Sequence, residues 1–423
     1  MTGVINLASE IEQQLPSKLV KFVRTAGKIA TNQNQELYLV GGVVRDLLLR
    51  RHTYDLDLAV EGDVLALVKQ LPQIEQAKLT VHPRFGTAKL QWSARGGWSI
   101  DFATARSETY ARPGALPTVN PGDIKDDLFR RDFTINAMAV SLNPSHYGEL
   151  IDLYGGRQDL DRKLIRILHD NSFIDDATRI WRALRYEQRL DFRIEGNTLR
   201  LLKRDITMLN TISSDRIRYE LECILNEEYP EKVLRRAAEL KVLPKLHPAL
   251  KGNGWLAEKF EQARRLTAPD PPPRGLYLAL LAYPVATEQV ESFISYLRFP
   301  KTESQVLRHT INIKEKLESL ADPGLKPSQI YRLLHGYALL ALTATSVATD
   351  SEAVHERIQL FLNKLRYVKT SLTGDDLIKM GIEPGPRIKE VLERLRDARL
   401  DGKAKSKEGE RELAEKQLSG DTQ

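Results

Sequence analysis

The stretch that most constrains the fold of this chain is YLVGGVVRDLLLRRHTYDLD, residues 38–57. The apolar letters YLV are typical of a short buried strand, and the letters VVRDLLLRR are typical of a helix. The pair Gly41-Gly42 between them indicates a tight turn. A second strand then carries Asp55 and Asp57. A strand, a turn, a helix and a strand in such a short span predict a small mixed sheet domain with helices packed on it.

This arrangement has the chemistry of a nucleotide site. Glycines let the backbone approach phosphates closely, and the free N–H groups at the start of the following helix point toward an anion. Because side chains alternate across a strand, Asp55 and Asp57 share one face, and paired carboxylates beside phosphates suit Mg²⁺. A Gly-Gly turn or an Asp-x-Asp pair alone is more often an ordinary turn or a solvated strand edge. Together they favour the nucleotide site.

The joined pattern, GG-x-V-R-D-x-L-L followed by D-x-D, resembles the head motif of the polymerase-beta-type nucleotidyltransferases. The resemblance is to the branch that contains the class II tRNA nucleotidyltransferases and the bacterial poly(A) polymerases. It implies that Gly42 and Arg45 contact the triphosphate. It also implies that Asp55 and Asp57 are catalytic and bind the metal, with Mg²⁺ as the cofactor.

Length and composition are compatible with this interpretation. A chain of 423 residues exceeds one ordinary core, and its 42% hydrophobic and 28% charged residues are typical of a globular protein in water. No apolar run is long enough to span a bilayer, and residues 1–19 lack the basic and apolar regions of a signal peptide. We therefore expect a cytoplasmic protein with no membrane partner.

Charge and cysteine content exclude some classes of protein. The net charge of +6 permits a polyanionic partner without requiring one. The single cysteine excludes an internal disulfide and a cysteine-based zinc site. This residue, Cys223, lies in a segment with helical periodicity, so we expect a buried structural thiol.

The chain changes character near residue 170, from mixed α/β to helical, so we expect the α+β class, with a mixed-sheet head followed by an all-α neck, body and tail. We expect one helix over residues 8–30, and two strands in LTVHPRFGTAKLQW and WSIDFATAR joined at Gly96-Gly97. The segment SETYARPGALPTVNPG has no periodicity and reads as a functional or mobile loop. The last twenty residues are polar, and we expect them to be frayed. The predicted domains are a head (1–165), a helical neck that selects the nucleobase (166–228), a helical body (229–310) and a helical, tRNA-binding tail (311–423).

A second motif, RRDFTINAMA at residues 130–139, places charged side chains among apolar ones, where they need partners. From spacing alone, an Arg-Asp ion pair at the start of a helix is an equally good interpretation. The string resembles the second motif of the family. That resemblance implies that Arg131 contacts the nucleotide phosphates and that Asp132 lies by the ribose.

A third constellation is FIDDATRIWRALRYEQRLDF, residues 173–192, in which Asp176, Arg179, Arg182 and Arg185 recur every three residues. On a helix this spacing gives one slowly drifting face, and a bare arginine ladder is usually a solvated stripe. A carboxylate can, however, accept the exocyclic amine of cytosine or adenine while a guanidinium donates to the adjacent ring nitrogen. Uracil and guanine offer the opposite pattern and would be mismatched.

This chemistry is how the family's Glu-Asp-x-x-Arg motif is understood to replace a nucleic acid template. In this sequence Asp175 stands where the family usually has Glu, whereas Asp176 and Arg179 match. The resemblance implies that Arg182 and Arg185 approach the phosphates. Further matches are IDLYGGRQDL (151–160), SSDRIRYELECIL (213–225) and a tail segment near the C-terminus that is expected to hold the tRNA elbow by its shape.

We therefore expect an enzyme that extends the 3′ end of tRNA with CMP, CMP and AMP from CTP and ATP, without a template and with release of pyrophosphate. Relatives that add only A, only CC, or poly(A) share every motif named above, so these activities remain open alternatives. The segment SETYARPGALPTVNPG resembles the form found in A-adding and poly(A)-type members. Two alternatives from other classes are a catalytically silent RNA-binding protein and an enzyme that transfers a nucleotide to a small molecule.

Overall fold

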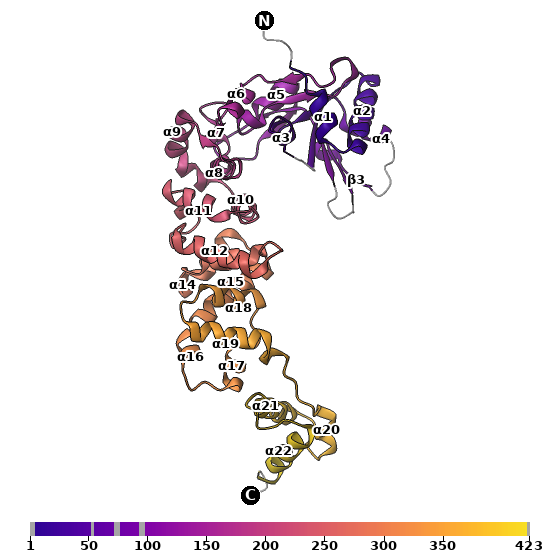
Figure 1. The fold of residues 1–423 in the computed structure, drawn as a ribbon. Coiled ribbons are helices and arrows are strands. Elements are labelled where there is room, and N and C mark those ends of the chain that lie inside the picture. Colours follow the sequence, from indigo (N-terminus) through magenta and orange to yellow (C-terminus); the bar gives the residue numbers. More distant parts are fainter. Residues whose placement is uncertain (1–4, 52–54, 72–76, 93–97, 421–423) are drawn as a thin grey trace. The chain divides into compact units, whose positions relative to one another are not determined.

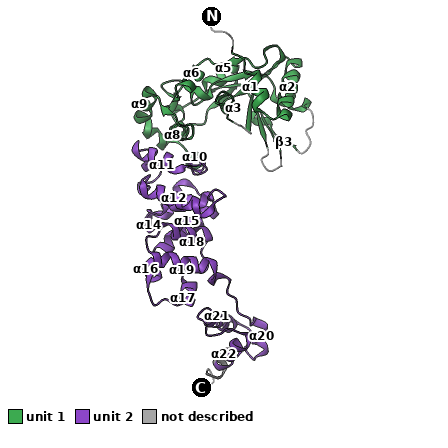
Figure 2. Ribbon diagram, in the orientation of Figure 1, with its two compact units in different colours: residues 1–220 green, residues 221–423 purple. Residues whose placement is uncertain are grey.

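The computed structural model describes residues 5–51, 55–71, 77–92 and 98–420 (Figure 1). The chain separates into two compact units, residues 1–220 and 221–423 (Figure 2). Within the described residues, all strands belong to the first unit. None of the described helices is long and apolar enough to cross a lipid bilayer.

The first unit is built around a seven-stranded mixed sheet with the strand order β3-β4-β5-β2-β1-β8-β9. Neighbouring strands are antiparallel except for β2 and β5, which run parallel. The strands are β1 Glu36–Val40, β2 Asp55–Glu61, β3 Ala77–His82, β4 Thr87–Trp92, β5 Ser99–Thr104, β8 Ala139–Ser141 and β9 Leu150–Ile151. The sheet and its helices confirm the α+β class predicted from the sequence.

Two small sheets and ten helices complete the described part of this unit, the last helix continuing past residue 220. The small sheets pair β6 Arg106–Thr109 with β7 Thr118–Pro121, and β10 Leu164–Ile165 with β11 Arg193–Ile194. The helices are α1 Ala8–Gln14, α2 Ser17–Asn32, α3 Gly42–Leu48, α4 Val64–Gln70, α5 Ile124–Phe129, α6 Gly156–Asp161, α7 Ser172–Asp175, α8 Thr178–Leu190, α9 Gly196–Asp205 and α10 Ser214–Leu225.

The two faces of the main sheet differ in what covers them. One face is apolar, and α2 packs on it, with the ring of Phe22 meeting that of Phe102 edge-on at 6.4 Å between centroids. The other face is covered near β1 by apolar side chains of α5. On β2 this second face exposes Asp55 and Asp57, whereas Leu56 between them is buried. The alternation of the strand therefore presents both carboxylates on the same open face, as the sequence predicts.

The helix α5 is positioned by local sequence signals. Asp123 precedes it and accepts the backbone N–H of Asp126, whose own carboxylate accepts the N–H of Asp123. This capping box satisfies N–H groups that the first turn leaves without partners. Arg130 and Arg131 follow directly after α5. By fixing the start of this helix, the cap helps to position the two arginines that begin the second predicted motif.

Three local predictions are wrong. The expected helix over residues 8–30 is two helices, because Pro16 between α1 and α2 has no N–H and breaks the hydrogen-bond ladder. The segment LTVHPRFGTAKLQW is two antiparallel strands, β3 and β4, with a turn at Pro83–Phe85. The segment SETYARPGALPTVNPG is not structureless, because β6 and β7 pair within it. The predicted turn at Gly96-Gly97 lies outside the described residues.

Every regular secondary-structure element described in the second unit is a helix. Its helices after α10 are α11 Pro230–Glu239, α12 Gly254–Thr267, α13 Arg274–Ala282, α14 Thr287–Leu297, α15 Lys301–Lys314, α16 Leu317–Ala321, α17 Pro327–Leu334, α18 Leu339–Ala348, α19 Glu352–Asn363, α20 Gly374–Lys379, α21 Pro386–Leu400 and α22 Lys407–Gly420. Cys223 on α10 is free and half-buried, so it is less buried than expected. The predicted four-part division stays a prediction.

The last helix corrects the prediction of a frayed C-terminus. Within α22 the carboxylate of Glu410 is buried and accepts the backbone N–H groups of Ser371 and Leu372. It also forms an ion pair with Arg399 of α21 at 2.5 Å. A buried carboxylate with these partners ties a polar segment to its neighbours, so residues 407–420 are helical although their composition resembles that of a loose end.

Candidate nucleotide-binding site

A cavity of about 440 Å³ opens at the exposed face of the sheet, entirely within the first unit. Its walls come from the β1–α3 turn, β2, the β6–β7 hairpin, the segment after α5, and the helices α8 and α10. The lining residues are Gly41, Gly42, Asp57, Glu108, Tyr110, Pro117, Arg130, Arg131, Asp132, Asn136, Asp176, Arg179, Arg182, Tyr186 and Arg216. Residues of all three predicted motifs therefore lie in its walls, together with residues of the β6–β7 hairpin and of α10.

The glycine turn is required by the geometry of the cavity wall. Gly41 has φ +77° and ψ −134°, a conformation that side chains with a Cβ rarely adopt. A Cβ at this position would lie 2.6 Å from Nη1 of Arg131. Gly42 then begins α3. The turn thus brings bare backbone against an arginine and the start of a helix, which is an arrangement that suits an anion.

The carboxylates of β2 lie beside a third carboxylate that the sequence did not reveal. Asp57 lines the cavity, and on the parallel strand β5 its register partner is Asp101, which forms an ion pair with Lys89 at 2.9 Å. Partial burial raises the pKa of Asp57, Arg131 opposes that shift, and the charges of Asp101 and Asp55 add to it. Crowded carboxylates of this kind are relieved by a divalent cation.

Asp55 lies on the same exposed face of β2 but does not line the cavity. Its Oδ1 accepts the hydroxyl of Ser99 at 2.7 Å. Within the described ranges, no group of three or more His, Cys, Asp or Glu side chains is arranged to hold a metal ion. Any ion at this strand would therefore rely on the two aspartates together with oxygens from a ligand, which is the usual coordination of Mg²⁺ by phosphate-binding proteins.

The arginines of the second motif are anchored by one buried carboxylate. Asp127 is 1% exposed and forms ion pairs with Arg130 at 2.6 Å and Arg131 at 2.7 Å. Burial alone would raise the pKa of Asp127, but the two guanidinium groups hold it below the ordinary value. Arg130 also pairs with Glu108 at 3.2 Å. Both arginines consequently have fixed orientations in the cavity wall.

Asp132 occupies the middle of the cavity wall, and both of its carboxylate oxygens accept hydrogen bonds. Its Oδ1 accepts the N–H of Phe133 and the amide of Asn136, and its Oδ2 accepts Nε of Arg182 at 2.8 Å. Although burial acts in the opposite direction, Arg182 and Asn136 hold the pKa of Asp132 below its ordinary value. The guanidinium of Arg182 also lies over the ring of Tyr186, 5.5 Å from its centroid.

The arginine ladder is split by the structure. Arg179, Arg182 and Arg185 lie on α8, but Asp176 precedes this helix, with extended backbone at φ −140° and ψ 96°. The prediction that all four share a helix face is therefore wrong for Asp176. The reason is that its Oδ1 accepts the N–H and the hydroxyl of Thr178, at 3.0 and 2.6 Å, which stops the helix from extending backward.

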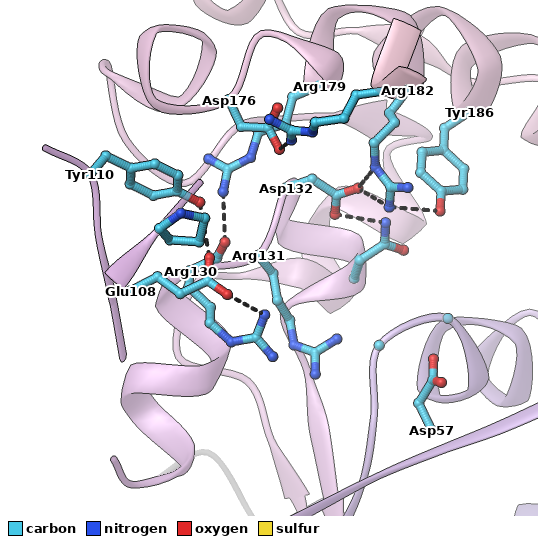
Figure 3. Close-up of a pocket in the computed structure, with 15 residues that line it drawn as sticks. Asp57, Glu108, Tyr110, Arg130, Arg131, Asp132, Asp176, Arg179, Arg182 and Tyr186 are labelled. Atoms are coloured by element: carbon cyan, nitrogen blue, oxygen red, sulfur yellow. Dashed lines mark hydrogen bonds and ion pairs between the residues drawn. The ribbon is translucent and has the colours of Figure 1, made fainter. Parts of the chain in front are cut away.

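The cavity has two chemically distinct ends (Figure 3). Asp57 lies at one end, while Asp176, Arg179 and Arg182 lie at the opposite end, with Arg131 and Asp132 between them. Near Asp176, the hydroxyl of Tyr110 donates to Glu108 at 2.9 Å. The arrangement can hold an elongated anion with a metal-binding end and a base-binding end.

Two residues that the sequence assigns to phosphate binding are placed behind this wall. Arg45 is 5% exposed and donates to Asp46 and to Asn136, without lining the cavity. Arg185 is also buried and forms an ion pair with Glu220 at 3.2 Å. Both support the wall from behind, and their contact with phosphate stays a prediction.

Sequence reasoning missed several lining residues, namely Glu108, Tyr110, Pro117, Arg130, Asn136, Tyr186 and Arg216. Four of them lie inside the motifs quoted above, namely Arg130, Asn136, Tyr186 and Arg216. Their membership of a motif could have identified them as candidate site residues. The other three lie in the segment that reads as a loop. Nothing in its periodicity indicates the β6–β7 hairpin that carries Glu108 and frames the cavity beside Tyr110 and Pro117.

Comparison with known proteins agrees with the geometry. Residues 37–166 match the family model "Poly A polymerase head domain", and residues 191–252 match "Probable RNA and SrmB- binding site of polymerase A". A relative from Geobacter sulfurreducens, an A-adding tRNA nucleotidyltransferase, is 34% identical over 96% of this chain and 48% of its own length. This chain therefore spans about half the length of that relative.

Other relatives are covered almost completely. The A-adding tRNA nucleotidyltransferase of Halalkalibacterium halodurans is 32% identical over 92% of this chain and 90% of its own length. The CC-adding tRNA nucleotidyltransferase of Deinococcus radiodurans is 30% identical over 89% of this chain and 88% of its own length.

Solved structures show the same fold. The Thermotoga maritima CCA-adding enzyme complexed with tRNA superposes with a TM-score of 0.76 at 32% identity, over 99% of this chain and all of that one. Complexes of a CCA-adding enzyme with CTP and with ATP give TM-scores of 0.80 and 0.81, each at 32% identity over 99% of this chain and all of that one. With the motifs, the cavity and near-complete coverage of relatives in agreement, this chain belongs to the family of tRNA nucleotidyltransferases that carry a poly(A) polymerase head domain.

Proposed function

We propose that this protein transfers a nucleotide from a nucleoside triphosphate to the 3′ end of tRNA, with release of pyrophosphate. The observation that carries the proposal is the cavity whose one end holds Asp57 and whose other end holds Asp176 and Arg179. The first end has the groups that phosphoryl chemistry needs, and the second has the groups that read a base edge. Similarity to structures complexed with tRNA, CTP and ATP supports the same assignment.

The residues at the phosphate end fit a divalent cation. Asp55 and Asp57 supply oxygen ligands on one strand face. Burial, with a smaller contribution from the charges of Asp101 and Asp55, raises the pKa of Asp57, and a bound cation would offset both effects. We assign the pair as the holders of Mg²⁺. When bound, Mg²⁺ lowers the pKa of the attacking hydroxyl and stabilises charge on the leaving oxygens. Asp101 and its partner Lys89 support the pair from the adjacent strand.

The chain's own residues orient the triphosphate and the sugar. Arg131 extends into the cavity beside Gly41, where its guanidinium can hold phosphate oxygens in place. Asp132, held by Arg182 and Asn136, is positioned to accept a ribose hydroxyl. Because these groups are prearranged, little reorganisation is needed when the nucleotide binds.

The base end selects by hydrogen-bond complementarity. Asp176 can accept the exocyclic amine of adenine or cytosine, and Arg179 can donate to the ring nitrogen beside it. Guanine and uracil present a carbonyl and a ring N–H there, so both protein groups would lose their partners. A site of this kind rejects the wrong base strongly because its buried polar groups are left unpaired.

Within this class we favour addition of AMP to tRNA that already ends in CC. The segment SETYARPGALPTVNPG resembles the form in A-adding and poly(A)-type members, and it forms the β6–β7 hairpin whose Tyr110 and Pro117 line the cavity. Two relatives compared above, at 34% and 32% identity, are named A-adding. Full addition of CCA, the activity expected first from the sequence, is the second candidate because the solved structures are of CCA-adding enzymes.

Three tRNA substrates separate these activities. They end before CCA, after C and after CC, and each is incubated with the protein, Mg²⁺, and CTP, ATP or both. We expect extension of the CC-ended tRNA only, by one AMP. Completion of all three substrates to CCA would replace this proposal by the second candidate, and continued A addition would indicate a poly(A) polymerase.

The same assay tests the alternatives from other classes. A protein that binds tRNA but extends none of the three substrates with any nucleotide would be a silent RNA-binding protein. Pyrophosphate release from ATP and a small acceptor molecule, without tRNA, would indicate a small-molecule nucleotidyltransferase. The cytoplasmic location stays a prediction from the sequence.

A further inference from the structure

Arg216 stands out among the lining residues because no motif role is assigned to it. It lies near the start of α10, and it reaches the base end of the cavity. Its Nη2 donates to Oδ2 of Asp176 at 2.7 Å, forming an ion pair across 40 residues of sequence. The guanidinium therefore contacts the carboxylate that the proposed function uses to read the base.

The carboxylate of Asp176 is held at both of its oxygens. Oδ1 accepts the N–H and hydroxyl of Thr178, at 3.0 and 2.6 Å, and Oδ2 accepts Arg216. With both oxygens engaged, the carboxylate plane has one orientation. Its remaining lone pairs then point in set directions, which a base amine must match.

The guanidinium of Arg216 keeps this position at a cost. Its Nη1 is buried and has no hydrogen-bond partner among the described residues. A buried donor without a partner is destabilising, so an arginine that served only for packing would turn this nitrogen toward solvent or a carbonyl group. The ion pair with Asp176 holds the side chain where it is.

Arg179 lies in a different environment. Its Nη1 donates to the hydroxyl of Ser172 at 2.7 Å, and its Nη2 donates to the carbonyl of Arg130 at 2.6 Å. These contacts fix Arg179 independently of Asp176. Asp176 and Arg179 are thus held by different partners, and Arg216 holds Asp176, the hydrogen-bond acceptor of the pair.

We propose that Arg216 is a positioning residue for nucleotide selection. It orients the carboxylate of Asp176 so that the site takes nucleoside triphosphates whose base carries an exocyclic amine beside a ring-nitrogen acceptor. This inference rests on the proposed function and deepens it. Without Arg216 the carboxylate rotates about its side-chain bonds, and the amine loses part of its advantage over a carbonyl oxygen.

The test measures kcat and KM for ATP, GTP, CTP and UTP on a CC-ended tRNA with Mg²⁺. The variants are Arg216→Met and Arg216→Lys. We expect Arg216→Met to lower the ratio of kcat/KM for ATP to that for GTP by about 10- to 100-fold, mainly through a higher KM for ATP. Arg216→Lys should restore part of the ratio, since it keeps the charge without the two-pronged donor.

Arg218→Met is the matched control on the same helix. Arg218 forms an ion pair with Asp215 at 3.1 Å and does not line the cavity. We expect this variant to leave the ATP to GTP ratio unchanged. Thr178→Val loosens the other oxygen of Asp176 from a separate helix, and we expect it to lower the ratio in the same direction, which keeps the test decisive if Arg216→Met does not fold.

The outcomes separate this inference from the proposed function. If the wild-type protein extends tRNA with ATP in preference to GTP but Arg216→Met lowers both nucleotides equally, Arg216 is merely structural and the inference is overturned. An unchanged ratio in both Arg216 variants overturns it as well. If the wild-type protein itself shows no preference for amine-bearing bases, the proposed function fails first.

Discussion

The two ends of the cavity use carboxylates in opposite ways. At the phosphate end, Asp57 lies on an exposed strand face among other carboxylates, and its pKa is raised. At the base end and in the middle wall, Asp176 and Asp132 are held by arginines and short hydrogen bonds. The pKa of Asp132 is lowered.

This difference supports the ligand that we propose for each end. Carboxylates crowded on one face of a sheet favour a cation, because the cation adds positive charge among them. Neutralised and oriented carboxylates leave only hydrogen-bond geometry to be matched, which suits the recognition of an uncharged base edge. The difference in charge supports our proposal that the end with Asp57 holds a cation and that the end with Asp176 reads a base.

The largest expected effect comes from removing the phosphate-end pair. The double substitution Asp55→Ala with Asp57→Ala should lower single-turnover incorporation of AMP by about 1,000-fold or more, because the stabilisation supplied by a bound cation is lost. Binding of tRNA, followed by gel shift, should stay within about twofold of the wild-type value, as expected for a change outside the RNA contacts. A parallel loss of tRNA binding would instead assign the pair a structural role.

Removing the charged partner of Asp132 should lower the stability of the fold. Arg182→Met leaves the buried carboxylate of Asp132 without its guanidinium partner, so the free energy of unfolding should fall by about 3 kcal/mol. Denaturant unfolding at pH 7 measures this loss.

The companion double variant Arg182→Met with Asp132→Asn should recover part of the lost stability, because it leaves no unpaired buried charge.

The same ion pair predicts a pH dependence. The pKa of Asp132 is lowered in the folded state, so the contribution of Asp132 to stability is present above the ordinary Asp pKa and is lost as the pH falls through the lowered value. If Arg182→Met is as stable as the wild type, Asp132 is better solvated than its burial indicates.

The glycine turn offers a matched pair of smaller effects. Gly41 and Gly155 both have positive φ, but an added Cβ meets Arg131 at Gly41 and meets nothing within 4 Å at Gly155. Gly155→Ala should therefore cost only the backbone strain, about 1 kcal/mol of unfolding free energy. Gly41→Ala should cost about 2 kcal/mol and also raise the KM for ATP. Equal KM values for the two variants would argue against a phosphate site at this turn.

The smallest expected effect is the pH dependence of Asp57. Its folded-state pKa lies above the ordinary 3.8, so protonation favours the folded state. Its contribution to stability is then full below the unfolded-state pKa and is lost as the pH rises through the raised value. Melting temperatures from pH 3.5 to 6 in EDTA measure the effect as a difference: the wild type should lose stability relative to Asp57→Asn as the pH rises, because the two proteins share all other titrating groups. A slope that Mg²⁺ leaves unaltered would contradict cation binding by this carboxylate.

Much of the site could be predicted from short segments. The Gly41-Gly42 turn, the shared face of Asp55 and Asp57, and the presence of Asp132, Asp176 and Arg179 in one cavity follow from local spacing and from resemblance to a family. Local signals are reliable there because a tight turn and the alternation of a strand depend on neighbouring residues alone.

Which arginines face the cavity could not be predicted in the same way. Arg182 lines it whereas Arg185, three residues later on α8, pairs with Glu220 behind the wall. The rotation of a helix about its axis is set by packing against distant segments. The same reason explains why Arg45 is buried against Asn136, 91 residues away.

The sequence by itself therefore determined the turn, the carboxylate pair, the helical second half and the family. Only the tertiary structure decided that Asp101 stands opposite Asp57, that Asp176 lies outside α8, and that Arg216 holds its carboxylate. The physical reason is the distance along the chain over which the deciding contacts act. Turns, strand alternation and helix periodicity are set by contacts between residues a few positions apart, whereas a binding site is made where segments far apart in the chain pack together and their buried charges find partners.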